Sequence, residues 1–185
     1  MKRFCQNNAQ NIIFTFCGLL MFFLSSCGSE TPQTPLNKQP RNLTKENLLE
    51  MNRVLAELET KNIEQYVAET DSTFRKSPSL IWYKIEQQGS GKKLTRGDKV
   101  HILFNVRLLD GSLCYTPDHK GDRNISLGRY DITRGLDEAL LMLNDGGRGT
   151  FIIPADLAFG MPGDGDCIGA KRTVIYEILS VEKTE

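Results

Sequence analysis

The sequence predicts an α+β protein in which a curved antiparallel β-sheet wraps around one short helix, preceded by a separate N-terminal helix. Three patterns indicate this fold: apolar residues at helical spacing within 132–143, a mostly apolar strand at 149–153, and strict alternation of apolar residues over 99–109. A sheet with one apolar face needs a cover, and 133–143 is the helix nearest to it in the chain. We therefore expect these elements to pack together.

The short helix presents one apolar face. The residues on this face are Ile132, Leu136, Ala139, Leu140 and Leu143. Gly146 and Gly147 then stop the helix, because glycine adopts the positive φ values that helix termini use. The strand at 149–153 follows and ends at Pro154, which cannot donate a ladder hydrogen bond.

Two other segments belong to the predicted sheet. Along 99–109 the alternating residues are Val100, Ile102, Phe104, Val106 and Leu108. Asp110 and Gly111 follow as a hairpin turn. Segment 80–85 is rich in apolar and aromatic residues and is a predicted strand.

The N-terminal helix is predicted over 44–70, within a helical segment that spans 44–76. Its apolar residues recur three and four positions apart: Leu48, Met51, Leu55 and Leu58. Two interpretations remain open, because the run is too short to establish a sustained heptad pattern. The helix either joins two copies of the chain as a homodimer or packs on its own domain.

The N-terminus predicts export and lipidation. Lys2 and Arg3 precede an apolar run, 12–24, that is too short to span a bilayer comfortably, so we expect a signal peptide over 1–26. The run ends in Leu24-Ser25-Ser26-Cys27, which resembles a bacterial lipobox and makes Cys27 the expected lipidation site. An ordinary signal peptide with a chance cysteine is the alternative.

The mature chain would then begin at Cys27 with a tether. Residues 27–43 are polar and proline-rich, as is typical of extended linkers. The domain at 80–185 would follow the helical segment. This layout predicts an extracytoplasmic protein, anchored by lipid to a bacterial membrane and facing the periplasm or the cell surface.

Charge and cysteine content argue against several functions. The 23 Lys and Arg residues balance 23 Asp and Glu residues, with no basic stripe, so a nucleic-acid partner is not expected. After processing, Cys114 and Cys167 are the remaining thiols. The two histidines, His101 and His119, form no cluster with them, so neither a metal, nor a cofactor, nor a Cys–His catalytic pair is expected.

The order of motifs resembles the FKBP-type peptidyl-prolyl isomerases over about residues 80 to 183. The segments that carry the resemblance are Ile132 to Leu140, then Gly146 and Gly147, then Ile153-Pro154-Ala155-Asp156-Leu157-Ala158-Phe159-Gly160. Among lipoproteins the chain is most similar to the gliding-motility-associated FKBP lipoproteins of Bacteroidetes. The resemblance implies the FKBP-like fold, with a last strand at 173–177, and prolyl isomerase activity.

The resemblance also implies an apolar, bowl-shaped site. The candidate catalytic residues are Phe104, Ile132, Leu136, Phe159, Ile168 and Tyr176. The candidate substrate-binding residues are Cys114, Tyr115, Arg123 and Asp131. Several depart from the family pattern, since Cys114 replaces a phenylalanine, Tyr115 an aspartate, Leu136 a tryptophan and Arg123 a wall aromatic.

The expected function is prolyl isomerisation of proline-containing polypeptide clients, weakened by these departures, in support of extracytoplasmic protein folding. A non-catalytic peptide-binding or chaperone module is the alternative, and a structural lipoprotein with a filled pocket is a third. The family layout also implies that Cys114 and Cys167 lie side by side. They form either a disulfide or two independent small buried residues.

Overall fold

The structure is a computed structural model that describes residues 44–184. The predicted signal peptide, Cys27 and the tether lie outside the described residues. Within 44–184, no helix is both long enough and apolar enough to cross a membrane.

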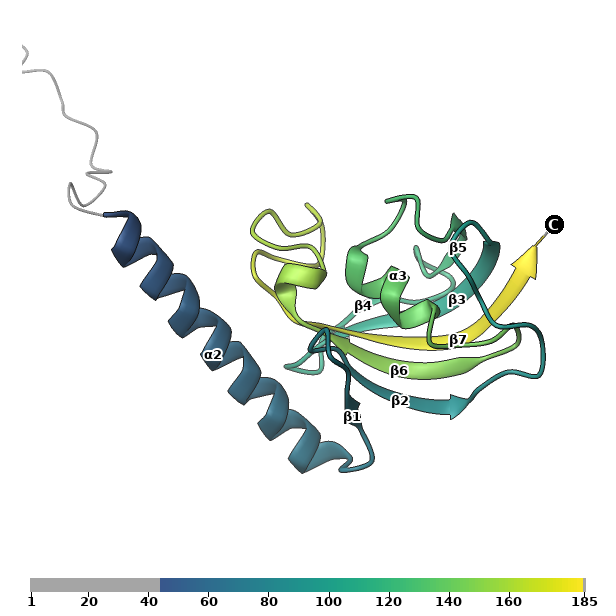
Figure 1. Cartoon of the computed structure of the whole chain (residues 1–185), viewed down its shortest axis with the longest axis horizontal. Helices are drawn as coiled ribbons and strands as arrows, with labels where there is room; N and C mark the ends of the chain where they lie inside the picture. Colours follow the sequence, from purple (N-terminus) through teal and green to yellow (C-terminus); the bar gives the residue numbers. More distant parts are fainter. Residues whose placement is uncertain (1–43, 185) are drawn as a thin grey trace, which may run out of the picture. The chain divides into compact units, whose positions relative to one another are not determined.

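A seven-stranded antiparallel sheet curves around one short helix, which confirms the predicted fold class (Figure 1). The elements in chain order are α2 (Lys45–Thr70), β1 (Arg75–Lys76), β2 (Trp82–Gln87), β3 (Lys99–Leu108), β4 (Leu113–Tyr115), β5 (Asp122–Ser126), α3 (Arg134–Leu140), β6 (Arg148–Ile153), the 3₁₀ turn η2 (Ala155–Leu157) and β7 (Val174–Thr184). The strand order is β1-β2-β6-β7-β3-β4, and β5 also pairs with β3.

Strand β3 organises the sheet. Its residues alternate between buried and more exposed along its whole length, as the sequence predicts. On one side β3 pairs with β7, while on the other it pairs first with β5 and then with β4. Phe104 lies at this change of partner, where its amide donates to the Gly121 carbonyl at 2.8 Å.

Three elements have boundaries that differ from the prediction by two residues or more. Helix α3 ends at Leu140 because the amides of Met142 and Leu143 bond three residues back, which tightens the chain into turns. Strand β2 begins at Trp82, since the amides of Leu80 and Ile81 bond to Ser77 in a turn. Strand β7 runs to Thr184, beyond the predicted 173–177, because it pairs with the full length of β3.

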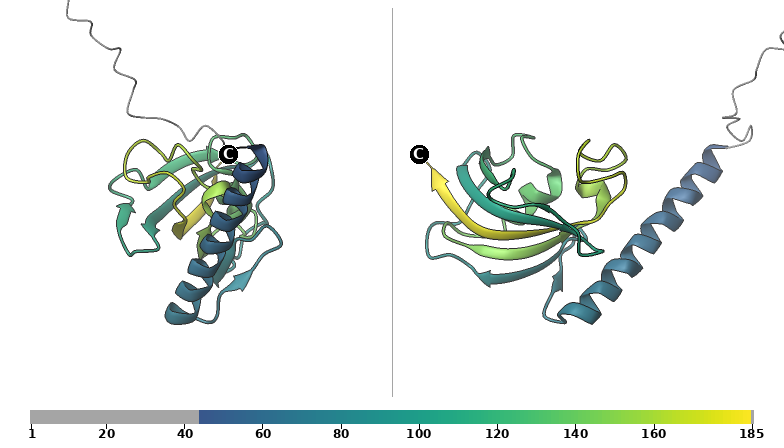
Figure 2. Two further views of the ribbon diagram at one scale, coloured as in Figure 1. Left: turned by 90° about the vertical axis from the view of Figure 1, so that its left-hand side faces the viewer. Right: turned by 180° about the vertical axis from the view of Figure 1, so that it is seen from behind.

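Helix α3 lies in the concavity of the sheet, and two further views show the strands curving around it (Figure 2). Its buried residues are Gly135, Leu136, Ala139 and Leu140. A Cβ at Gly135 would lie 2.3 Å from Ile153 Cγ2, so the close approach of α3 to β6 requires glycine there.

Helix α2 is continuous and begins at the N-cap Thr44, whose hydroxyl accepts from the Asn47 amide at 3.4 Å. Its C-terminal half packs on the second face of the sheet, where Ile63 and Val67 meet Ile152 and Ile175. Side chains alternate between the two faces along β6 and β7. Phe151, next to Ile152, and Tyr176, next to Ile175, therefore point into the core around α3.

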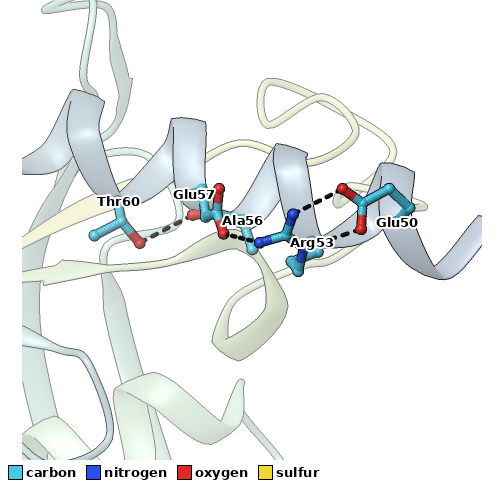
Figure 3. A network of polar contacts seen from close by, with 5 residues as sticks. All are labelled: Glu50, Arg53, Ala56, Glu57 and Thr60. Atoms are coloured by element: carbon cyan, nitrogen blue, oxygen red, sulfur yellow. Dashed lines mark hydrogen bonds and ion pairs between the residues drawn. The ribbon is translucent and has the colours of Figure 1, made fainter.

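The N-terminal half of α2 leaves its apolar side chains exposed. These residues are Leu48, Leu49, Met51, Val54, Leu55 and Leu58. Arg53 forms ion pairs with Glu50 and Glu57, both at 2.7 Å, along another side of the same turns (Figure 3). The second half of the helix thus packs on its own domain, whereas the first half presents an uncovered apolar surface, and the homodimer stays a prediction.

Candidate active site

The floor of the candidate site is apolar and buried. Phe104, Leu136, Ile168 and Tyr176 are each at most 3% exposed and belong to one core cluster. They come from β3, α3, the loop after η2, and β7. The rings of Phe104 and Tyr176 are tilted by 54° with centroids 5.4 Å apart, a favourable aromatic geometry.

The rim is only partly buried. Ile132 and Phe159 pack against the same core cluster from the segments before α3 and after η2. We call these two residues, together with Phe104, Leu136, Ile168 and Tyr176, the bowl. The structure therefore brings all six candidate catalytic residues to one cluster.

The polar groups at the floor stay uncharged. Burial raises the pKa of Tyr176 above its usual range, so its hydroxyl remains protonated. The buried hydroxyl of Thr133, the N-cap of α3, lies near enough to Tyr176 to oppose that rise in pKa, although no hydrogen bond of ordinary geometry joins it to the described residues. The sequence analysis gave Thr133 no role, since it is one polar residue within an apolar motif.

Tyr115 and Asp164 form a polar pair beside the bowl. Tyr115 is buried, and its hydroxyl donates to Asp164 Oδ2. Asp164 Oδ1 accepts from the amides of Asp166 and Ile168, each at 2.9 Å. The sequence analysis missed Asp164, which lies 49 positions from Tyr115 in a loop without periodicity.

This pair shifts two pKa values in opposite directions. Burial and the Asp164 carboxylate raise the pKa of Tyr115 to about 12. Burial acts to raise the pKa of Asp164, but the hydrogen bonds from Tyr115 and two backbone amides outweigh it and hold that pKa below its usual range. A carboxylate is thus present beside the bowl, although position 115 carries a tyrosine instead of the family's aspartate.

Two further links join the loop after η2 to the segment around β4. The sulfurs of Cys114 and Cys167 lie 2.03 Å apart, with their Cα atoms separated by 5.6 Å. Lys120 forms an ion pair with Asp166. Together with the Tyr115–Asp164 bond, these contacts fix the loop that carries Ile168.

The last two candidate substrate-binding residues, Arg123 and Asp131, are exposed and lie outside the buried cluster. Arg123 is on β5, and Asp131 is in the segment that leads to α3. His101 bonds to Asp122 at 2.6 Å on the sheet surface. Over residues 44–184, no group of three or more His, Cys, Asp or Glu side chains is arranged to hold a metal ion.

A separate groove of about 870 Å³ lies between α2 and the loops that follow β3 and β6. Its lining includes Leu55, Leu58, Tyr66, Leu109 and Met161 but none of the bowl residues. We place the candidate site at the bowl instead of the groove, because the bowl contains the aromatic floor and lies beside the Tyr115–Asp164 pair.

A curved antiparallel sheet closed over one short helix, with an aromatic bowl at one end of that helix, defines the FKBP-like class of domain. In agreement, residues 90–179 match the family of FKBP-type peptidyl-prolyl cis-trans isomerases. Residues 90–179 of this chain are therefore similar to that family of domains. The proteins of this family are isomerases of the peptide bond that precedes proline.

Relatives and solved structures agree with this assignment. The probable FKBP-type isomerase FkpA of Neisseria meningitidis serogroup B is 26% identical, over 83% of this chain and 62% of that protein. The outer membrane protein MIP of Legionella longbeachae is 32% identical, over 57% and 46%. The chain thus spans roughly half of the length of these relatives.

Among solved structures, FkpA from Escherichia coli superposes with a TM-score of 0.58 at 22% identity, covering 75% of this chain and 66% of that one. AtFKBP13 gives a TM-score of 0.52 at 20% identity, covering 60% and 95%. At these identities the likeness shows the fold.

Proposed function

We propose that this protein catalyses the cis/trans isomerisation of peptide bonds before proline in extracytoplasmic polypeptide clients. The observation that carries the proposal is the bowl: a buried aromatic floor of Phe104 and Tyr176, bounded by the partly exposed Ile132 and Phe159. Its apolar, aromatic lining suits a proline ring and the residue beside it.

Elementary chemistry explains how a site without a nucleophile can accelerate this reaction. The barrier, about 18–20 kcal/mol, comes from the partial double bond of the amide, which is weakened as the bond twists. Water stabilises the planar, polarised amide more than the twisted one. An apolar bowl therefore lowers the barrier by removing water and by holding the twisted form.

The same bowl supports weak activity. Leu136 forms its floor in place of the family's tryptophan, and Tyr115 in place of the aspartate holds its carboxylate partner, Asp164, in a closed pair. Both changes reduce the number of side-chain groups that can contact and stabilise the twisted amide. They also favour the alternative, a chaperone module that holds apolar segments without catalysis.

The test is the exchange rate of a short Leu-Pro peptide, measured by NMR exchange spectroscopy with increasing protein. We expect acceleration that is lost in Phe104→Ala and Tyr176→Ala variants whose folding is verified by circular dichroism. Binding of the peptide with an unchanged exchange rate would establish the chaperone module instead. If the protein neither binds the peptide nor accelerates its exchange, both functions are overturned.

We also propose that the mature protein is attached to a bacterial membrane through lipid on Cys27. The supporting observations are the lipobox-like Leu24 to Cys27 run and a relative named outer membrane protein MIP. Stable attachment takes more than one acyl chain, which bacterial lipoprotein processing supplies on a single cysteine. Cys27→Ser should move the protein from the membrane fraction to the soluble fraction, and continued membrane fractionation would contradict the lipid anchor.

A further inference from the structure

The side chain of Arg123 is directed to the concave face of the sheet, where the bowl lies. Arg123 pairs directly with Ile102, and Ile125 pairs with Val100. Residues directly opposite each other in an antiparallel pair project from the same face. Since Ile102, Val100 and Ile125 are all buried in the core cluster, Arg123 leaves β5 on that same face.

Arg123 is also close to the bowl along the chain and in space. Gly121, two residues before it, accepts the hydrogen bond from the Phe104 amide. Phe104 lies two residues after Ile102 on the buried face of β3. Burial dominates the raised pKa of Tyr176, and the charge of Arg123 opposes that rise, which places the guanidinium within electrostatic reach of the floor.

The charge of Arg123 is not neutralised within residues 44–184, where no carboxylate lies within ion-pair distance of it. Nearby acidic groups have other partners. Asp122 bonds to His101, and Asp164 accepts from Tyr115 and two amides. An exposed arginine therefore stands beside an apolar site, at a position where the family has an aromatic residue.

We propose that Arg123 makes this isomerase selective for segments in which Glu or Asp lies next to the proline. The inference rests on the proposed isomerase function and adds a substrate class to it. A proline ring in the bowl would bring a neighbouring carboxylate toward the guanidinium, which binds carboxylates through two parallel hydrogen bonds. Because the arginine is exposed, we expect a modest effect, about two- to fivefold in kcat/KM.

The experiment compares three peptides that differ only in the residue before proline: Glu, Gln or Lys. A second set places the same residues after proline. Exchange is measured by NMR with the full chain in detergent micelles. In one set at least, the wild type should act on the Glu peptide about two- to fivefold faster than on the Gln peptide, and more slowly on Lys. This preference should decline with added salt, because exposed charges are screened.

The ratio of Glu to Gln rates is compared within each variant, so an overall loss of activity does not affect it. Arg123→Gln should bring the ratio to about one, Arg123→Glu should invert it, and Arg123→Lys should keep part of it. Arg148→Gln is the matched control, because Arg148 is an exposed arginine on β6 that pairs with Gln87. It should keep the wild-type ratio.

The outcomes separate the two proposals. If the wild type accelerates no peptide, the isomerase function fails. If it accelerates the Gln and Glu peptides equally in both sets, the selectivity fails while the isomerase function stands. A Glu preference that survives in Arg123→Gln would also overturn the role of Arg123. If that variant is inactive on every peptide, three other measurements still test the role of Arg123. They are the wild-type ratio of Glu to Gln rates, the salt dependence of that ratio, and the ratio in Arg123→Lys.

Discussion

Asp164 holds three hydrogen-bond donors at the edge of the bowl: the Tyr115 hydroxyl and the amides of Asp166 and Ile168. Through the last of these it orients Ile168, a floor residue. One side chain thus connects the β4 segment, the loop after η2 and the apolar floor. At the residue scale, this carboxylate links parts of the site that no sequence motif connects.

Asp164→Asn should destabilise the domain by about 1–2 kcal/mol, because a neutral amide replaces the charged acceptor and the hydrogen bonds from Tyr115 and the two backbone amides lose their charge assistance. Denaturant unfolding followed by circular dichroism measures the loss. Asp166→Asn is the control. It removes only the exposed ion pair with Lys120, so we expect a change below about 0.5 kcal/mol. Equal effects of the two substitutions would contradict the role of Asp164.

Residue-scale features were only partly predictable from sequence. Alternation along β3 identified Phe104 as buried, and the motifs identified Leu136, since both depend on local periodicity. The partner of Tyr115 depends on a contact over 49 positions between a strand and an irregular loop. No period links those segments, so only the folded chain reveals that Asp164 supplies the carboxylate.

At the element scale, the loop that carries Ile168 is fixed to β4 by the cysteine pair. Their Cα separation of 5.6 Å lies within the range for disulfides, and a bridge would close a separation of 53 residues. In the chain-entropy model such a loop contributes about 4 kcal/mol to stability. This bridge also needs an oxidising compartment, in agreement with the predicted export.

Titration of thiols tests the bridge directly. The chain from Gly28 onward contains only Cys114 and Cys167, so the unfolded, unreduced protein should show no free thiol, and two after reduction. Two free thiols before reduction would rule the disulfide out. The double variant Cys114→Ala/Cys167→Ala should be less stable than the oxidised protein and close to the reduced one.

The junction between α2 and the sheet should weaken in acid. Asp71 caps the C-terminus of α2 and bonds to Lys84 on β2, and this bond together with the Thr73 amide lowers the pKa of Asp71 to about 2. A lowered pKa in the folded state gives stability that is complete above the unfolded pKa, near 3.8, and is lost as pH falls toward 2.

Asp71→Asn should therefore reduce the loss of stability between pH 5 and pH 2, measured by denaturant midpoints at each pH. Asparagine keeps the acceptor for the Thr73 amide, so the comparison isolates the charge. Asp118→Asn is the control, because Asp118 is an exposed aspartate in the β4–β5 loop. It should leave the wild-type acid profile unchanged. Parallel acid profiles of wild type and Asp71→Asn would contradict the assignment.

At the scale of the whole molecule, the sequence predicted the sheet and α3 because their patterns are strong and locally consistent. Gly135 illustrates the limit: the motif contains it, but only the approach of α3 to Ile153 explains why it must be glycine. For α2, one apolar stripe supported two interpretations. The structure shows that the second half packs on the domain, where Ile63 and Val67 are buried, while Leu48 to Leu58 remain uncovered and the dimer stays a prediction.

The uncovered half leads to the last prediction, that the chain forms a homodimer through α2. Leu48, Met51, Leu55 and Leu58 follow a three–four–three spacing, as in a coiled-coil seam, and are between 41% and 49% exposed. Arg53 forms ion pairs with Glu50 and Glu57 (Figure 3). At about 3.6 residues per turn these three residues lie on the side of the helix away from the stripe and would stay in water. Covering this stripe with the same stripe of a second copy removes it from water in both chains.

Sedimentation equilibrium of the chain from Gly28 onward should show a dimer that dissociates on dilution, and Leu55→Glu should make it monomeric. Leu179→Glu is the matched control, because Leu179 on β7 is 46% exposed against 42% for Leu55. It should leave the dimer intact. A wild-type monomer at every concentration would exclude the homodimer, and equal dissociation by both substitutions would place the interface elsewhere. A dimer would set two bowls on one assembly, where effective concentration would strengthen the binding of clients with several prolines.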